Sequence, residues 1–189
     1  MRTVYYAAPF FNSEEMSVMH HFQHIATPHP HLRVFYPYEA SLEDQGNIQD
    51  KGARRKVYLK NEQALIHNSE LIAWIDRKQL DGKQVQLCKR VLQDEGGEQL
   101  VYEWVGNGRE LKQPDLGTVW EMGFARARGK TIAAFTLQEE GKLNLMLTES
   151  VDIVLHGWNE LETYLALPHS MDVQQYIRDK AGFWKGDVE

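Results

Sequence analysis

Short apolar runs alternate with longer amphipathic stretches along most of the chain. Residues 3–8 (TVYYAA) carry no charge and are β-branched, aromatic or small, which is typical of a central strand buried on both faces. Residues 12–26 begin with the polar run NSEE and then place apolar side chains at helical spacing, so they predict a helix. Residues 31–36 alternate apolar and polar positions, as a second strand does.

The centre of the chain continues this alternation. Residues 37–51 are polar and without a periodic pattern, and we expect a loop that borders a functional site. A helical pattern over residues 52–69 leads into the apolar run 71–75, which predicts the third strand. An insertion follows at about residues 77–113. In it, alternating segments at residues 84–92 and 99–105 flank the turn sequence EGG and predict a β-hairpin.

After the insertion the pattern predicts a helix that stops near Gly129. The remaining expected elements are strands at 131–136 and 151–155, helices at 158–167 and 171–181, and a tail from 182. Strands that alternate with helices favour right-handed crossovers, a mainly parallel sheet, and ligands at the carboxyl ends of the strands. The predicted fold is α/β, a flavodoxin- or Rossmann-like three-layer sandwich with a five-stranded, mainly parallel sheet and an inserted β-hairpin.

Composition narrows the class of protein. With 189 residues, 42% of them hydrophobic, the chain can bury a sizeable core, and we expect a single domain over residues 1–189. A net charge of -6 argues against nucleic acid as a partner, because phosphate binding needs a basic face. The single cysteine, Cys88, allows no internal disulfide and suits a reducing cytosol. We expect a cytoplasmic protein without a signal peptide or membrane segment.

Histidines near the N-terminus raise the question of a metal site. They are His20, His21, His24, His29 and His31. His20 and His24 have the helical i, i+4 spacing, but neither a third ligand nor an HExxH glutamate accompanies them. We therefore expect no metal and no cofactor.

The stretch from Asp115 to Ala125 (DLGTVWEMGFA) resembles a loop that turns into a helix and carries two carboxylates. Asp115 and Thr118 have side chains that cap helix N-termini, and Gly117 permits a tight turn. The simplest interpretation of Glu121 is structural, since Thr118-x-x-Glu121 has the spacing of a capping box in the first helical turn.

Three motifs in order indicate more than a helix cap. They are residues 3–12 (TVYYAAPFFN), the D-x-G-x-x-x-E-x-G-x-A sequence at 115–125, and N-L-M at 144–146. Together they resemble the nucleoside 2-deoxyribosyltransferases, and residues 182–189 resemble the C-terminus of some members. The resemblance spans nearly the whole chain apart from the insertion.

The resemblance implies a site around Glu121. Glu121 would be the nucleophile, because cleavage of a C1′–N bond builds positive charge on the sugar that a carboxylate can trap as an ester. Tyr5 would orient Glu121, although a strand tyrosine can also serve only to pack the core. Asp115 and Gly117 would lie beside the substrate, and Phe11 would lie against the base.

The resemblance also implies a general acid and residues contributed by a neighbouring subunit, and both assignments have alternatives. The family places an acidic residue in the helix before the third strand, where two alignments put either Glu62 or Asn61. The general acid is therefore Glu62, Asn61 with a bound water, or Asp115. Asn144 and Met146 correspond to residues that complete a neighbouring subunit's site, so we expect a homo-oligomer, whereas Asn144 alone would suit an ordinary turn.

The leading hypothesis is a transferase that moves a 2-deoxyribosyl group from a deoxynucleoside to a free purine or pyrimidine base. One alternative is a hydrolase of 2′-deoxynucleoside 5′-monophosphates, which is less favoured because the carboxylate of Asp115 would repel a phosphate. Another is a non-catalytic nucleotide sensor with the same fold. A sensor would not need Glu121 and Tyr5 together.

Overall fold

The computed structural model describes residues 1–10, 13–42, 51–76, 83–94, 97–108, 116–137 and 150–184. The chain divides into two compact units, residues Met1–Ile75 with Asp115–Glu189, and residues Asp76–Pro114. The first unit holds the sheet and the helices around it, and the second holds the insertion.

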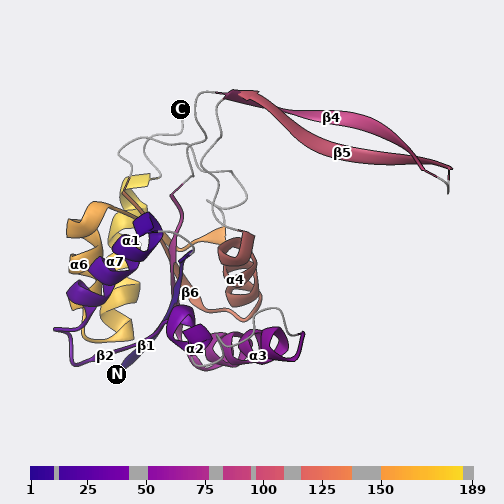
Figure 1. The fold of residues 1–189 in the computed structure, drawn as a ribbon. Coiled ribbons are helices and arrows are strands. Elements are labelled where there is room, and N and C mark those ends of the chain that lie inside the picture. The colour runs from indigo at the N-terminus through magenta and orange to yellow at the C-terminus, as the bar shows by residue number, and fades with distance from the viewer. Residues whose placement is uncertain are drawn as a thin grey trace. The chain divides into compact units, whose positions relative to one another are not determined.

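A five-stranded sheet forms the centre of the first unit (Figure 1). Its strands are β1 (Arg2–Ala7), β2 (Leu32–Phe35), β3 (Glu70–Trp74), β6 (Thr131–Thr136) and β7 (Ile153–His156). Their order is β2-β1-β3-β6-β7, and every neighbouring pair is parallel. This is the flavodoxin-like order, which places β1 and β3 next to each other at the point where the direction of winding reverses.

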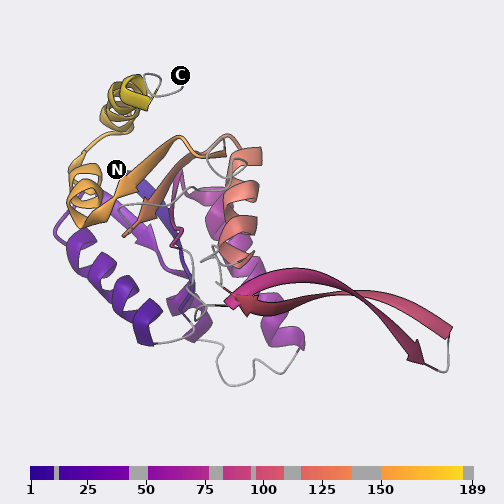
Figure 2. The ribbon, with the colours of Figure 1, turned by 90° about the horizontal axis from the view of Figure 1, so that it is seen from above.

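Helices cover both faces of the sheet, as Figures 1 and 2 show. One layer contains α1 (Ser13–Ala26), α6 (Gly157–Ala166) and α7 (Ser170–Trp184), and the other contains α3 (Lys51–His67) and α4 (Leu116–Ala127). Alternation along β1 divides the core, because Tyr6 packs with α1 and α6 while Tyr5 packs with α3 and α4. The α/β fold with a five-stranded parallel sheet is confirmed.

A buried ion pair closes the amino end of the sheet. Arg2 of β1 donates from Nε to Oε1 of Glu70 over 2.9 Å and from a terminal nitrogen to Oε2 over 2.7 Å. Tyr164 of α6 donates to the same carboxylate over 3.2 Å, and Arg2 also donates to the backbone oxygen of Leu167 over 2.6 Å. A bidentate guanidinium and a phenol thus satisfy Glu70, which is 2% exposed.

The loop predicted at residues 37–51 is wrong in its first part. Residues Pro37–Leu42 form a short helix, α2, and residues 43–50 lie outside the described part of the chain. Proline suits the first turn of a helix because its missing amide has no partner there, and Glu39 complements the helix dipole. Six residues are too few to show helical periodicity, so the pattern could not reveal this element.

The insertion forms the predicted hairpin. Strands β4 (Lys83–Asp94) and β5 (Gly97–Gly108) pair antiparallel, from Lys83 opposite Gly108 to Asp94 opposite Gly97. Both strands extend beyond the predicted segments, and the ribbon twists visibly in Figure 2.

Among the described helices of the chain, none is long and apolar enough to span a membrane.

Candidate functional site

The helix that carries the central motif begins earlier than the sequence suggests. α4 starts at Leu116, so Thr118 is already inside the helix and Glu121 lies in its second turn. An N-cap residue must precede the first helical residue, and the expected capping box between Thr118 and Glu121 is therefore wrong. Thr118 is instead buried, with 1% of its surface exposed.

Glu121 instead accepts a hydrogen bond from strand β1. The hydroxyl of Tyr5 on β1 donates to Oε1 of Glu121 over 2.5 Å. Tyr5 is fully buried, and its ring belongs to the same apolar cluster as Met122 and Ala125, which flank Glu121 on α4. α4 leads into the parallel strand β6, so its N-terminal turns lie toward the carboxyl ends of the strands, where open α/β sheets bind ligands.

The environment of Tyr5 keeps the phenol protonated. Burial raises the pKa of Tyr5 far above its ordinary value, and the nearby carboxylate of Glu121 raises it further by charge and by accepting the hydrogen bond. The phenol is therefore a neutral donor at neutral pH. A carboxylate that accepts from a fixed neutral donor is held in one orientation without losing its charge.

The two alternatives on α3, Asn61 and Glu62, have different contacts. Oδ1 of Asn61 is buried and has no hydrogen-bond partner among the described residues. Leu65, one helical turn later on the same face, packs in the cluster with Tyr5 and Met122. Glu62 instead accepts a 3.4 Å hydrogen bond from the exposed residue Tyr58 of its own helix. Asn61 therefore lies on the side of α3 that carries Leu65, and both Asn61 and Glu62 are partly buried.

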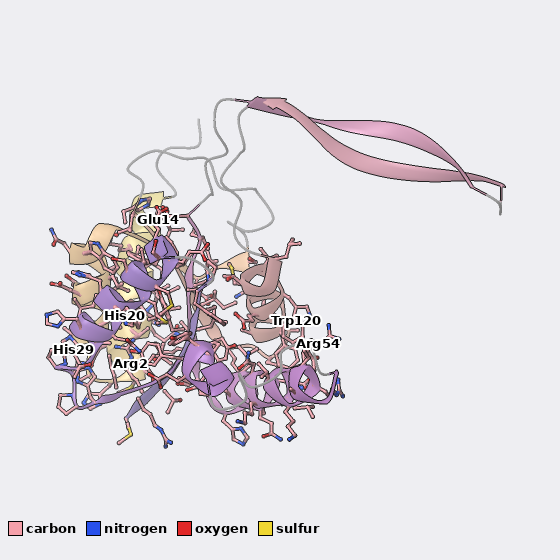
Figure 3. The ribbon with its side chains drawn as sticks, in the orientation of Figure 1. Arg2, Glu14, His20, His29, Arg54 and Trp120 are labelled. Carbon is pink, nitrogen blue, oxygen red and sulfur yellow. The ribbon has the colours of Figure 1, made fainter. Side chains whose placement is uncertain are left out.

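An aromatic strip lies next to this site on α3 and α4. Trp120, which precedes Glu121 and is labelled in Figure 3, contacts Tyr58 with ring centroids 5.6 Å apart and Phe124 at 5.3 Å. Trp120 is 44% exposed and Tyr58 40%. The helical spacing of Trp120 and Phe124 could have been read from the sequence, but the contact of Trp120 with Tyr58 of α3 could not.

Four of the predicted site residues lie outside the described part of the chain. They are Phe11, Asp115, Asn144 and Met146. Gly117 is described as the second residue of α4 and is exposed. The structure thus brings Tyr5 and Glu121 together, places Asn61 on the same side of the core, and leaves the other predicted contacts as predictions.

The histidines have ordinary structural contacts. Nε2 of His31 lies 2.9 Å from the backbone oxygen of Leu165, and Nδ1 of His20 lies 3.1 Å from the side-chain oxygen of Gln23. Within the ranges that the structure describes, no group of three or more His, Cys, Asp or Glu residues could hold a metal ion.

One residue that the sequence did not single out also contacts the site. Phe35, at the end of β2, stacks on the ring of Tyr5. The sequence does place an aromatic residue at the end of the second predicted strand. Such a residue is common in strands, so it did not by itself indicate a role in the site. Its position opposite Tyr5 depends on the register of two parallel strands, which the sequence alone does not give.

Comparison with known proteins supports the fold. No protein-family model matches the chain, and a search of the curated proteins finds no match. Among solved structures, a 2-deoxyribosyltransferase from Bacillus psychrosaccharolyticus superposes with a TM-score of 0.59 and 21% identity, covering 85% of this chain and 90% of that chain.

Two further solved structures are more distant. A 2-deoxyribosyltransferase from Leishmania mexicana has a TM-score of 0.44 and 17% identity over 73% of this chain and 66% of that chain. A CMP N-glycosidase from Clostridium botulinum has a TM-score of 0.41 and 16% identity over 87% of this chain and 96% of that chain. Of these three, only the Bacillus enzyme exceeds 0.5. The fold implied by the sequence motifs, that of the deoxyribosyltransferases, is thereby confirmed.

Proposed function

We propose that this chain is a nucleoside deoxyribosyltransferase in which Glu121 is the nucleophile. The observation that supports this proposal most strongly is the hydrogen bond from the buried phenol of Tyr5 to Oε1 of Glu121. The glutamate is also the one that the sequence motif singles out, and the fold is shared with a solved 2-deoxyribosyltransferase. A helix cap explains neither the position of Glu121 in the second turn nor its buried partner.

In the first half-reaction, Oε2 of Glu121 attacks C1′ of the deoxynucleoside. The C1′–O bond forms as the C1′–N bond breaks, the electron pair goes to the base nitrogen, and a proton delivered to the base lets it leave. In the second half-reaction a nitrogen of a different free base attacks C1′, the ester bond returns its electron pair to Glu121, and the proton of that nitrogen passes to the group that protonated the first base. Two inversions give overall retention of the β configuration.

Tyr5 has a positioning role in this proposal. Its hydroxyl fixes the rotation of the Glu121 carboxylate through Oε1, so that Oε2 is directed at the sugar. A neutral donor suits this task, because an arginine in the same place would hold the negative charge that must be shared with the sugar cation. The high pKa of Tyr5, caused mainly by burial, ensures that it does not ionise.

Asn61 is the better candidate for a contact to the departing base. Its buried Oδ1 has no hydrogen-bond partner among the described residues, and a buried acceptor that lacks a partner is costly unless a ligand or water satisfies it. An amide cannot titrate, so Asn61 would hold the base or a water, while Asp115 is the candidate acid. Phe11 and Gly117 remain proposed substrate contacts. Asn144 and Met146 remain proposed contributions from a neighbouring subunit of a homo-oligomer.

The test is a base-exchange assay on the purified protein. Thymidine or deoxyinosine is incubated with and without adenine, and products are separated by chromatography for the wild type, Glu121→Gln and Glu121→Ala. The proposal predicts a new deoxynucleoside that requires both adenine and Glu121. Release of base without exchange would favour the hydrolase, to be repeated with deoxynucleoside monophosphates. Absence of all turnover would favour a sensor.

A further inference from the structure

Phe35 forms one wall of the space that holds Tyr5. The centroids of the two rings are 5.4 Å apart and their planes differ by 23°. The residues face each other because Tyr5 and Phe35 are register partners on the neighbouring parallel strands β1 and β2. Tyr5 is fully buried, whereas Phe35 is partly buried, so the ring of Phe35 lies between Tyr5 and the outside of the sheet.

The two sides of Tyr5 differ in what could replace them. β2 is an edge strand of the described sheet, so Phe35 belongs to the last strand on that side of Tyr5. On the inner side, the register partner of Tyr5 on β3 is Leu71, which is 1% exposed and belongs to the same cluster. Removing the ring of Phe35 would therefore open space toward the edge of the sheet, while the inner side would stay closed.

We propose that Phe35 is a positioning residue for the reaction, whose ring keeps the hydroxyl of Tyr5 directed at Glu121 and keeps water away from their hydrogen bond. This inference rests on the proposed function of Glu121. The hydroxyl lies at the far end of the tyrosine side chain, so a small rotation near the backbone displaces it by a large amount. Hydrogen bonds weaken steeply when their geometry is lost, and water that enters competes for both partners.

The first variant to make is Phe35→Leu, which keeps an apolar side chain and removes the flat ring. We expect kcat for base exchange to fall by roughly tenfold to a hundredfold, as small displacements of catalytic groups do, with KM nearly unchanged. Phe35→Tyr keeps a stacked ring and should recover most of the rate. Equal kcat in Phe35→Leu and wild type would overturn the inference.

The chain provides a matched control on the opposite face of the sheet. Phe22 of α1 stacks on Tyr6, the next residue of β1, with centroids 4.0 Å apart and planes 22° apart. Phe22→Leu removes a similar aromatic contact from the core but leaves Tyr5 and Glu121 untouched. Both leucine variants should lower the melting temperature, and only Phe35→Leu should lower kcat. A similar loss of kcat in both would reduce the role of Phe35 to core packing.

A double-mutant cycle tests whether Phe35 acts through Tyr5. Tyr5→Phe removes the hydroxyl, so adding Phe35→Leu to it should change kcat by no more than about twofold. A full further loss in the double variant would show that Phe35 affects the rate by another route.

A measurement that does not depend on turnover separates this inference from the proposed function. In protein labelled with ¹³C at the tyrosine Cζ, the Tyr5 signal, assigned by its absence in Tyr5→Phe, should keep its neutral position in wild type at pH values where exposed tyrosines ionise, about 10. In Phe35→Leu it should shift or broaden. That change without any base exchange would refute the proposed function alone, whereas an unchanged signal would overturn the role of Phe35.

Discussion

Two tyrosine–glutamate hydrogen bonds lie at opposite ends of this sheet, and we propose different roles for them. At the amino end, Tyr164 donates to Glu70, which also receives two hydrogen bonds from Arg2. Toward the carboxyl end, Tyr5 donates to Glu121. Both phenols are fully buried, and burial raises the pKa of each well above its ordinary value.

In the proposed function, the surroundings of a carboxylate, rather than its hydrogen bond to tyrosine, decide its use. The guanidinium of Arg2 neutralises Glu70 and also reaches the last carbonyl groups of α6, so this pair joins β1, β3 and α6. A carboxylate held in that way is a poor nucleophile. Glu121 lies where parallel sheets bind ligands, and it accepts a hydrogen bond from a neutral phenol.

Glu121→Gln should cause the largest difference between the carboxyl end and the amino end of the sheet, because it should affect activity and leave stability almost unchanged. The amide cannot form the glycosyl ester, so base exchange should fall by at least about a thousandfold, as it does when a nucleophile is removed. Its free energy of unfolding should stay close to that of wild type, because Gln still accepts from Tyr5. Chromatography of products and urea unfolding of the same sample measure both. A base-exchange rate in Glu121→Gln above roughly a tenth of the wild-type rate would contradict the role of Glu121 as the nucleophile.

Arg2→Met should have the opposite profile. It leaves Glu70 buried without its cation, which costs about 3–5 kcal/mol in other proteins. The control is Lys180→Ala, which removes the partly exposed ion pair between Lys180 and Glu160 and should cost less than about 1 kcal/mol. Urea unfolding measures both changes. A cost for Arg2→Met as small as that of the control would show that the amino-end pair contributes little.

Tyr5→Phe should have smaller effects, a moderate loss of activity and a small change in stability. It removes one hydroxyl from a buried position and leaves the ring, so stability should change by about 1 kcal/mol while kcat falls by roughly tenfold to a hundredfold. Steady-state kinetics with deoxyinosine and adenine measure kcat and KM separately. A raised KM with normal kcat would instead place Tyr5 in substrate binding.

Asn61→Ala and Glu62→Ala form a matched pair of neighbours on α3. Loss of the Asn61 carbonyl should raise the KM for the base or lower kcat by about tenfold, the effect of one buried hydrogen bond. Loss of Glu62, which contacts Tyr58 on the exposed side, should change either constant less. Steady-state kinetics at varied adenine concentration show which substitution has the larger effect. A larger effect for Glu62→Ala would favour the alignment with the family that places Glu62 at the site.

The smallest expected effect is a pH dependence of stability at the amino end. Burial, His31 and Arg2 lower the pKa of His29 below its ordinary value of 6.5, and Figure 3 shows His29 and Arg2 at the same end of the molecule. The unfolded chain therefore binds this proton first, and stability should decrease slightly as the pH falls through and below about 6.5. His29→Gln should lose less stability than wild type between pH 7 and 5 in urea unfolding. An identical decrease in both would exclude His29 as the cause.

Much of the fold could be predicted because the sheet is buried on both faces. Strand β6, and β1 after Arg2, are short uncharged runs, and the helices between the strands are amphipathic, so their order and type were readable. The helix α2 was not, because it is shorter than two helical turns. The ion pair of Arg2 with Glu70 was also not readable, since it joins residues 68 positions apart that become neighbours only through strand order.

The candidate site could be predicted only as far as motifs reach. Tyr5 and Glu121 were identified from their motifs, but the start of α4 was misplaced because Thr118 also suits a cap. The choice between Asn61 and Glu62 could not be made, because adjacent helical residues differ by about 100° in direction and only packing against the core decides which faces inward. Phe35 depended on strand register in the same way.

The central claim is that Glu121 becomes covalently attached to the sugar, and mass spectrometry of the quenched reaction tests it most directly. Protein mixed with deoxyinosine is denatured by acid within the first turnovers and digested, and the peptide that contains Glu121 is sequenced. The account predicts one added deoxyribosyl group on Glu121, absent from Glu121→Gln and removed when adenine is present before the quench. Base exchange that proceeds with no adduct on Glu121, or that persists in Glu121→Gln, would contradict it.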